Sequence, residues 1–179
     1  MPLNEHERAV AAVRAGAIVA TRMTANRGTG ALVVLDLDDF TSVNVKHGSQ
    51  LGDRLLAEVE AGLRRRFDGS GAVQRLAGDE FMVIVADVAD DEALLGVVES
   101  VRRTVARCKV RTRWLRRCVT VSATVGFARW HDEQSGKEAL RTAATALVVM
   151  KERVRRGRAN RLGSHTAQGL WRATRPSGW

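Results

Sequence analysis

One tight turn between two strand-like runs constrains the fold of this chain more than any other feature. The runs cover residues 72–76 and 80–86, and Ala77-Gly78-Asp79 joins them. Glycine and aspartate in a short connection are typical of a β-hairpin, because both tolerate the backbone conformations that a tight turn needs. A hairpin pairs its strands antiparallel, which argues against a doubly wound parallel sheet.

Two further runs predict strands. Residues 31–35 are continuously apolar, as in a central strand that is buried on both faces. Residues 118–130 alternate between apolar and polar side chains, with Thr120, Ser122 and Thr124 on the polar face. This alternation predicts one long, half-buried antiparallel strand.

Helical periodicity marks four other segments. It predicts helices over residues 5–25 and 52–67, after Asp90, and from the Ser135 capping box towards Val154. Together with the strands, this order favours the α/β class of the α+β type. We therefore expect a single domain with a central mixed, largely antiparallel sheet covered by helices.

Composition excludes several classes of protein. A chain of 179 residues with 45% hydrophobic and 27% charged residues is typical of one globular domain. Cys108 and Cys118 form no CxxC or Cys/His pattern, so neither a disulfide framework nor a zinc site is expected. No signal-peptide pattern and no apolar run of roughly 20 residues is present, so we expect a cytoplasmic protein without membrane contact.

The net charge of +9 is unevenly distributed. Residues 102–117 hold eight basic and no acidic side chains, residues 151–179 hold eight basic and one acidic, and the remainder holds 13 basic against 19 acidic. The body of the chain is therefore acidic. Only four basic residues are lysine and no nucleic-acid-binding motif accompanies the basic stretches, so nucleic-acid binding is the weakest of the functions considered.

Two acidic clusters follow predicted strands. Asp36-Leu37-Asp38-Asp39 comes directly after the first buried run, and Asp79-Glu80 lies in the hairpin turn. Carboxylates at a strand end and on a neighbouring turn can converge on Mg²⁺, which prefers a few hard oxygen ligands and leaves positions for substrate phosphates. Acidic residues also mark strand ends because these ends are solvated, and spacing alone leaves both interpretations open.

The full pattern is more specific than the spacing of the acids. Asp36-x-Asp38-x-Phe40-x-x-Val43-Asn44-x-x-x-Gly48-x-x-x-Gly52-Asp53, followed by Arg75-Leu76-Ala77-Gly78-Asp79-Glu80-Phe81, resembles the GGDEF family of diguanylate cyclases. The strand from Val119 to Gly126 and the helix end at Ala146-Leu147-x-x-x-Lys151 fit the same family. The resemblance covers residues 29–163, which leaves residues 1–28 as a candidate dimerisation helix and residues 164–179 as a basic tail.

The resemblance implies a reaction and a set of roles. Two GTP molecules, held by a homodimer with Mg²⁺ or Mn²⁺, condense into cyclic di-GMP and release pyrophosphate. The metal would be held by Asp36, Asp79 and the carbonyl of Leu37, with Glu80 and Asp38 as auxiliary carboxylates. The resemblance implies that Asn44 and Asp53 bind guanine. It implies that the start of a helix at Phe40 and Thr41 binds the phosphates and that Gly78 in the turn lies at the substrate. Lys151 and Arg155 would bind the outer phosphates, with Arg158 as the alternative to Arg155.

Simpler interpretations exist for several of these residues. Asn44 could merely end a helix, and Asp53 could cap the helix that follows it. Lys151 and Arg155 could be a solvated helix end, where cations are favoured anyway. The joint agreement with the family offsets favours the functional assignment.

The chain departs from the family pattern at several positions. Alanine replaces the first glycine of the turn at Ala77, where the backbone passes close to the nucleotide and a permissive φ could be needed. Thr41 replaces a lysine near the phosphates, whereas Val45 and Ser49 are interpreted as changes in local packing. The Arg-x-x-Asp motif of the inhibitory product site is absent, since Asp68 and Gly71 occupy its positions.

Two functions remain. The first is a diguanylate cyclase without product inhibition, with an activity that the variant turn lowers or leaves intact. The second is a catalytically degenerate GGDEF-like module that binds GTP or a cyclic dinucleotide and signals to a protein partner.

Overall fold

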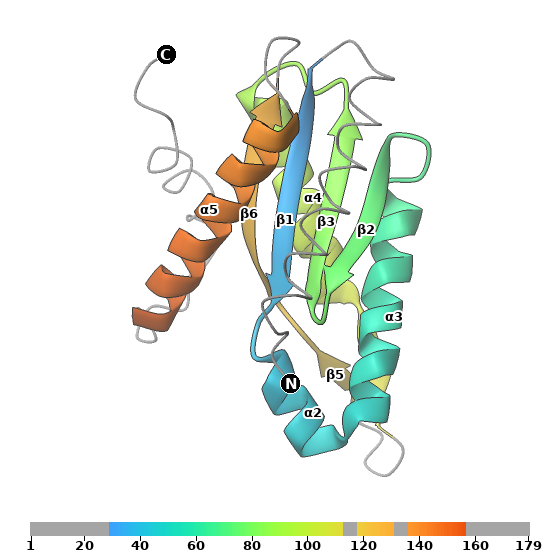
Figure 1. The fold of residues 1–179 in the computed structure, drawn as a ribbon. Coiled ribbons are helices and arrows are strands. Elements are labelled where there is room, and N and C mark those ends of the chain that lie inside the picture. The colour runs from blue at the N-terminus through green and yellow to red at the C-terminus, as the bar shows by residue number, and fades with distance from the viewer. Residues whose placement is uncertain (1–28, 113–117, 131–135, 157–179) are drawn as a thin grey trace.

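The computed structural model of the chain describes residues 29–112, 118–130 and 136–156 (Figure 1). The helix predicted over residues 5–25, the basic tail and Arg158 lie outside the described residues. Within the described part, no helix is both long and apolar enough to cross a bilayer.

Four strands form the main sheet, in the order β2-β3-β1-β6 (Figure 1). Every pairing between neighbours in this sheet is antiparallel. The predicted hairpin is confirmed as β2 and β3, and the predicted buried strand as the central β1. The bounds are β1 Gly30–Leu37, β2 Gly71–Ala77, β3 Glu80–Ala86 and β6 Ala123–Trp130.

Helices cover both faces of the sheet. The helices α3 (Ser49–Arg66) and α4 (Asp91–Arg107) pack on one face, where Val33 and Leu35 of β1 join the larger core cluster. The helix α5 (Gly136–Arg156) packs on the opposite face against Leu32 and Val34. Burial on both faces explains the continuous apolar run of β1. The predicted class, an antiparallel sheet covered by helices, is confirmed.

The short helix α2 (Phe40–His47) follows β1 and lies at one end of the sheet (Figure 1). Gly48 lies between α2 and α3 with φ 83°, a positive value that glycine adopts without strain. The helix α3 thus begins at Ser49, before the predicted start. The predicted cap of α4 is confirmed, because Asp90 accepts a hydrogen bond from the amide of Ala93 at 2.8 Å.

The single long strand predicted over residues 118–130 is wrong. Its first part is β5 (Cys118–Thr120), which pairs with β4 (Lys109–Arg111) in a separate two-stranded sheet, and β6 begins at Ala123. The strand breaks because Ser122 turns to Asp38: its carbonyl accepts from the Asp38 amide and its hydroxyl donates to the Asp38 carboxylate. Alternation of side chains cannot show such an interruption, since it continues on both sides of the break.

Candidate active site

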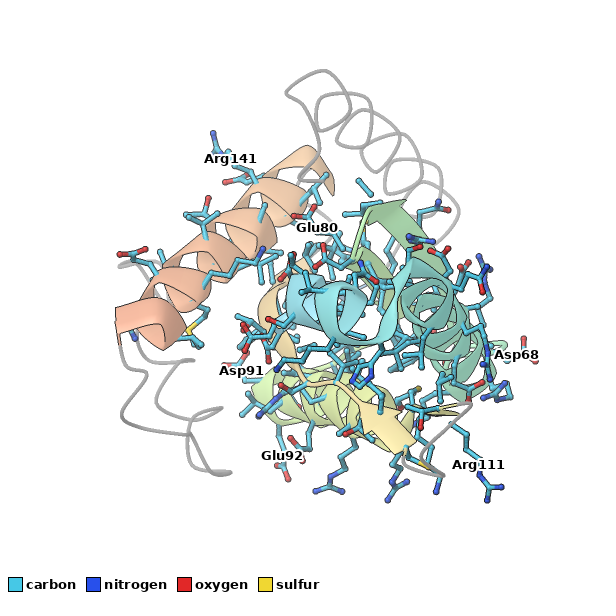
Figure 2. All side chains as sticks on the ribbon, turned by 90° about the horizontal axis from the view of Figure 1, so that it is seen from below. Asp68, Glu80, Asp91, Glu92, Arg111 and Arg141 are labelled. Atoms are coloured by element: carbon cyan, nitrogen blue, oxygen red, sulfur yellow. The ribbon has the colours of Figure 1, made fainter. Side chains whose placement is uncertain are left out.

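The two acidic clusters meet at one end of the sheet. The antiparallel register places Asp36 of β1 opposite Glu80 of β3. The amide of Leu37 donates a hydrogen bond of 3.2 Å to the carbonyl of Asp79 in the hairpin turn. Figure 2 shows Glu80 between α5 and α2, whereas Arg111 lies on another side of the molecule with the small sheet. Strand pairing alone therefore brings Asp36, Leu37, Asp79 and Glu80 together.

The helix α5 delivers a lysine to the same place. Gly126 of β6 permits the close approach of α5, since a Cβ there would lie 2.1 Å from the carbonyl oxygen of Ala143. Leu147 is buried against the sheet, and Lys151 follows one helical turn later. Its Nζ lies 2.5 Å from Oδ2 of Asp36. The structure thus joins two predicted site residues that are 115 positions apart.

The environment of Asp36 disfavours its charge. Its side chain is 13% exposed, and this burial, as the largest cause, raises the pKa of Asp36 from 3.8 to about 6. The hydrogen bond from Lys151 opposes the rise in pKa, while the charges of Asp79 and Glu80 add to it. The negative charges of Asp79 and Glu80 near Asp36 favour the binding of positive charge at this end of the sheet.

Asp38 uses its carboxylate within the protein. The hydroxyl of Ser122 donates to Oδ2 and the hydroxyl of Thr124 donates to Oδ1, each at 2.6 Å. Each carboxylate oxygen thus has one hydrogen-bond donor inside the protein. The polar face of Thr120, Ser122 and Thr124 was the sequence signal for these partners, but it did not indicate which acid they would bind.

The hairpin turn tolerates its alanine. Gly78 has the positive φ of the turn, 54°, whereas Ala77 is not among the residues with positive φ and pairs with Glu80 as the last residue of β2. The side chain of Arg75 braces the turn by donating from Nε to the carbonyl of Gly78 at 2.8 Å. The position of Ala77 therefore does not need glycine for backbone conformation.

A second part of the candidate site lies where α2 meets α3. The Oδ1 atom of Asn44 is buried and has no hydrogen-bond partner in the structure. It lies directly over Gly52, where a Cβ would come within 1.9 Å of it, and the ring of Phe40 is the next neighbour of that Cβ. Buried polar atoms are nearly always hydrogen-bonded, so this acceptor fits a ligand that brings an N–H group.

Asp53 directly follows Gly52 in the sequence and is exposed. Because α3 begins at Ser49, Asp53 is inside the helix and does not cap it. Asn44 does lie in the last turn of α2, where its main-chain carbonyl accepts from Gly48 at 2.9 Å. That bond leaves its side chain unused, so ending the helix does not account for the buried amide.

The departures from the family pattern have different surroundings. Thr41 is exposed at the start of α2. Val45 is 81% exposed and Ser49 is exposed as well, so the interpretation of these two as changes in local packing is wrong. The backbone of Arg155 continues α5, and its side chain lies outside the described part of the structure.

The oxygen donors at this end of the sheet are the carboxylates of Asp36 and Asp79 and the carbonyl of Leu37. Among the residues that the structure describes, no three acidic, histidine or cysteine side chains gather in ligand geometry. A cation bound to these oxygens would need further ligands from its substrate. Such an incomplete oxygen set is typical of Mg²⁺ sites that share the ion with substrate phosphates.

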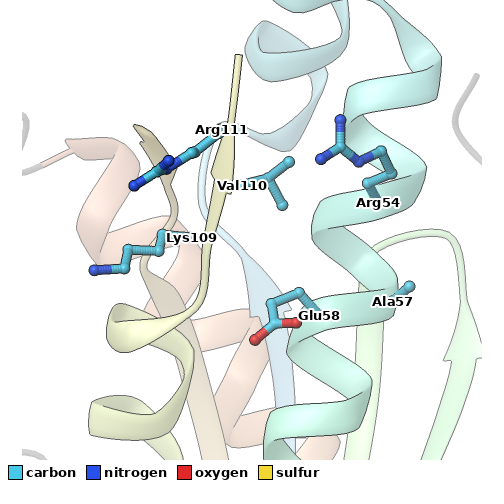
Figure 3. Close-up of a pocket in the computed structure, with 6 residues that line it drawn as sticks. All are labelled: Arg54, Ala57, Glu58, Lys109, Val110 and Arg111. Carbon is cyan, nitrogen blue, oxygen red and sulfur yellow. The ribbon is translucent and has the colours of Figure 1, made fainter. Parts of the chain in front are cut away.

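Two open hollows lie away from these carboxylates. The first, of about 450 Å³, lies between α3 and β4 and is lined by Arg54, Ala57, Glu58, Lys109, Val110 and Arg111 (Figure 3). Val110 points towards α3, whereas Lys109 and Arg111 point away from it (Figure 3), so the basic groups do not converge. The second, of about 430 Å³, borders β2 and includes Asp68 and Gly71, the positions of the missing inhibitory motif.

Comparison with known proteins identifies the family. Residues 17–157 match the family described as diguanylate cyclase, GGDEF domain. The chain therefore belongs to the GGDEF family, as the resemblance indicated.

Three similar proteins show the range of the family. The bifunctional diguanylate cyclase/cyclic di-GMP phosphodiesterase MucR of Pseudomonas aeruginosa is 33% identical over 129 residues, which are 71% of this chain and 18% of MucR. The GGDEF domain of DgcB from Caulobacter crescentus, solved in complex with c-di-GMP, has a TM-score of 0.67 at 23% identity, over 76% of this chain and 80% of that one. Diguanylate cyclase SiaD of Pseudomonas aeruginosa, solved with its activator SiaC, has a TM-score of 0.65 at 23% identity, over 76% of this chain and 54% of SiaD.

These likenesses differ in what they show. The two structural matches show the fold. The chain corresponds to 18% of the length of MucR, so the activity of that whole protein does not transfer to it.

Proposed function

We propose that this chain is a diguanylate cyclase, which condenses two GTP molecules into cyclic di-GMP and pyrophosphate. The observation that carries the proposal is the register of β1 and β3, which brings Asp36, Leu37 and the Asp79-Glu80 turn together beside Lys151. In the reaction, the 3′-hydroxyl of each GTP attacks the α-phosphate of the other. Positioning and neutralisation of charge supply most of the catalysis in such transfers.

Asp36, Asp79 and the carbonyl of Leu37 would hold Mg²⁺ or Mn²⁺. The bound cation would neutralise charge on the phosphates and orient them for attack. Glu80 is half-buried beside these ligands, and we assign to its carboxylate the acceptance of the proton from the attacking 3′-hydroxyl. Lys151 would leave Asp36 for the outer phosphates, which Arg155 also binds.

The α2–α3 corner would select guanine. The unpartnered Oδ1 of Asn44 and the exposed carboxylate of Asp53 are acceptors for the N1–H and N2–H donors of guanine, a pair that adenine lacks. The amides at Phe40 and Thr41, where α2 begins, would bind phosphate oxygens, as helix N-termini do. The turn at Gly78 would pass close to the nucleotide.

A homodimer would complete the reaction, because each product needs two GTP-loaded domains face to face. The solved complex of SiaD with its activator makes a protein partner a reasonable expectation for this chain too. The catalytically degenerate module remains the second candidate, since exposed Thr41 offers no positive charge to the phosphates.

The test is incubation of the purified chain with GTP and Mg²⁺ at high protein concentration, followed by separation of the nucleotides. Cyclic di-GMP is expected, and the D79N variant, which removes the charge of a metal ligand, should make none. GTP binding is measured separately, by calorimetric titration with an analogue whose α–β phosphate bridge cannot be cleaved. Binding without product would establish the non-catalytic module, and the absence of both would overturn the proposal.

A further inference from the structure

We propose that Asp38, Ser122 and Thr124 form a clamp that positions the metal-binding end of β1. The clamp touches neither metal nor substrate and acts through its neighbours Leu37 and Asp36. It rests on the proposed function, because it assigns these residues to the metal–GTP site. It also replaces the auxiliary metal role that the resemblance implied for Asp38.

Three hydrogen bonds build the clamp. The hydroxyls of Ser122 and Thr124 donate to different oxygens of the Asp38 carboxylate, each at 2.6 Å. The amide of Asp38 donates to the carbonyl of Ser122 at 2.9 Å. Bonds from hydroxyls to a carboxylate are short and strong because the acceptor carries charge. The main chain and side chain of Asp38 are thus fixed to Ser122, in the connection between β5 and β6, and to Thr124, near the start of β6.

The clamp lies at the point where the chain has the most freedom to go astray. Directly after Asp38, Asp39 adopts a left-handed conformation with φ 53°, and α2 begins at Phe40 without a side-chain cap. A non-glycine residue in this region is held there by its surroundings. The clamp supplies that constraint one residue before the turn, between the Leu37 carbonyl and the first amides of α2.

The burial of Thr124 makes its role specific. Thr124 is 7% exposed and is the only polar side chain in the described residues that is classed with the buried ones. It pairs with Asp36 across β1 and β6, while its hydroxyl reaches Asp38. Loss of this hydroxyl would leave one carboxylate oxygen of Asp38 without its donor, two residues from the metal ligand Asp36.

A purely structural role would predict a different result. If the clamp only stabilised the fold, its removal would lower the melting temperature and leave the metal affinity of the folded protein unchanged. If it positions the site, the metal affinity falls even in protein that is fully folded. Groups hydrogen-bonded directly to metal ligands affect metal affinity or activity by about 10- to 100-fold; the clamp acts on Asp36 and Leu37 through the main chain, so its effect is expected at the lower end of this range.

The decisive experiment measures the Mn²⁺ affinity of the full chain by electron paramagnetic resonance, in the presence of a GTP analogue whose α–β phosphate bridge cannot be cleaved. The T124V variant keeps the shape of the side chain and loses the hydroxyl, and it should bind Mn²⁺ about tenfold more weakly. T124S restores the hydroxyl and should restore affinity. The matched control is T104V, which removes a hydroxyl that donates to Ser100 at 2.7 Å on α4 and should leave Mn²⁺ affinity within about twofold of wild type.

The outcomes separate the clamp from the function on which it rests. Wild-type affinity in folded T124V would overturn the clamp while the cyclase proposal stands. No Mn²⁺ or analogue binding by wild type would overturn the proposed function and the clamp with it. Should T124V not fold, S122A serves instead, because Ser122 is exposed, and its Mn²⁺ affinity should be severalfold weaker; an unchanged affinity would overturn the clamp.

Discussion

The proposed metal end of the candidate site, at Asp36 and Asp38, and its proposed guanine end, at Asn44 and Asp53, differ in how their polar groups are paired. At the metal end, Asp36 pairs with Lys151 and Asp38 pairs with two hydroxyls, so these acids already have partners inside the protein. At the guanine end, the Oδ1 of Asn44 has no partner and Asp53 is exposed. A metal ion that binds Asp36 would therefore have to replace Lys151. Guanine that binds Asn44 and Asp53 would displace no partner from within the protein.

This difference has a physical origin. Buried carboxylates repel one another and lose hydration, so a resident cation such as Lys151 lowers the free energy of the metal-free protein. A single neutral amide oxygen costs far less to leave unpaired than a charge does. The free protein can therefore leave the Oδ1 atom of Asn44 unpaired, whereas it pairs the carboxylate of Asp36 with Lys151.

The largest expected effect is that of D36N at the metal end. Loss of this ligand should lower turnover by about 10²- to 10³-fold or more, because transition-state charge is no longer neutralised. Cyclic di-GMP formation by purified wild type and D36N measures this. Turnover of D36N near that of wild type would show that the metal site lies elsewhere.

The same variant should be more stable than wild type at neutral pH. The pKa of Asp36 is raised in the folded state, so the folded protein binds more protons than the unfolded chain between pH 3.8 and about 6. Metal-free stability should accordingly fall as pH rises through this window, by at most about 3 kcal/mol from this group. Denaturant titrations between pH 4 and 7 should show this fall in wild type and not in D36N.

The next largest effect is expected for G52A, a variant that tests whether Asn44 binds guanine. The new Cβ would come within 1.9 Å of Oδ1 of Asn44, so the amide must move and GTP affinity should fall by about tenfold or more. G96A is the matched control, since a Cβ at this helical glycine of α4 meets nothing within 4 Å. Calorimetric titration with a GTP analogue measures the affinity of both variants. If G52A bound the analogue as tightly as G96A does, Asn44 would have no role in guanine binding.

A smaller effect of mixed sign is expected for K151M. Without nucleotide, Mn²⁺ affinity at pH 8 should rise by about threefold to tenfold, because the competing ammonium group is gone. With a GTP analogue present, affinity should fall, because the phosphates lose a cation. R153M, on an exposed position of the same helix, should change neither. If Mn²⁺ affinity of K151M fell both without and with the GTP analogue, Lys151 would not compete with the metal for Asp36.

The smallest effect concerns the variant turn. A77G should change turnover by no more than about twofold, because position 77 does not need a left-handed conformation. G78A should lower both stability and turnover more than A77G, since Gly78 has φ 54°. A large gain in turnover from A77G would mean that the alanine methyl obstructs the nucleotide.

Much of the fold could be predicted because its signals are local. The hairpin turn, the continuous apolar run of β1 and the cap at Asp90 each depend on neighbouring residues, and all are confirmed. The break after β5 could not be predicted, because its cause is Asp38, a residue 84 positions from Ser122. Side-chain alternation reports which face a residue occupies, and it carries no information about a partner on another strand.

The sequence by itself determined the family, the hairpin and the set of acids from which a metal site can be made. Only the tertiary structure decided how these side chains are used: Asp36 pairs with Lys151, Asp38 accepts from Ser122 and Thr124, and the Oδ1 atom of Asn44 is buried against Gly52 without a partner. Residue types and spacing set the chemistry that is available, because they depend on composition and local conformation. Which side chains pair, which are buried and which polar atoms stay unpaired depends on strand order and on how closely the helices approach the sheet. These features arise only when the whole chain has folded.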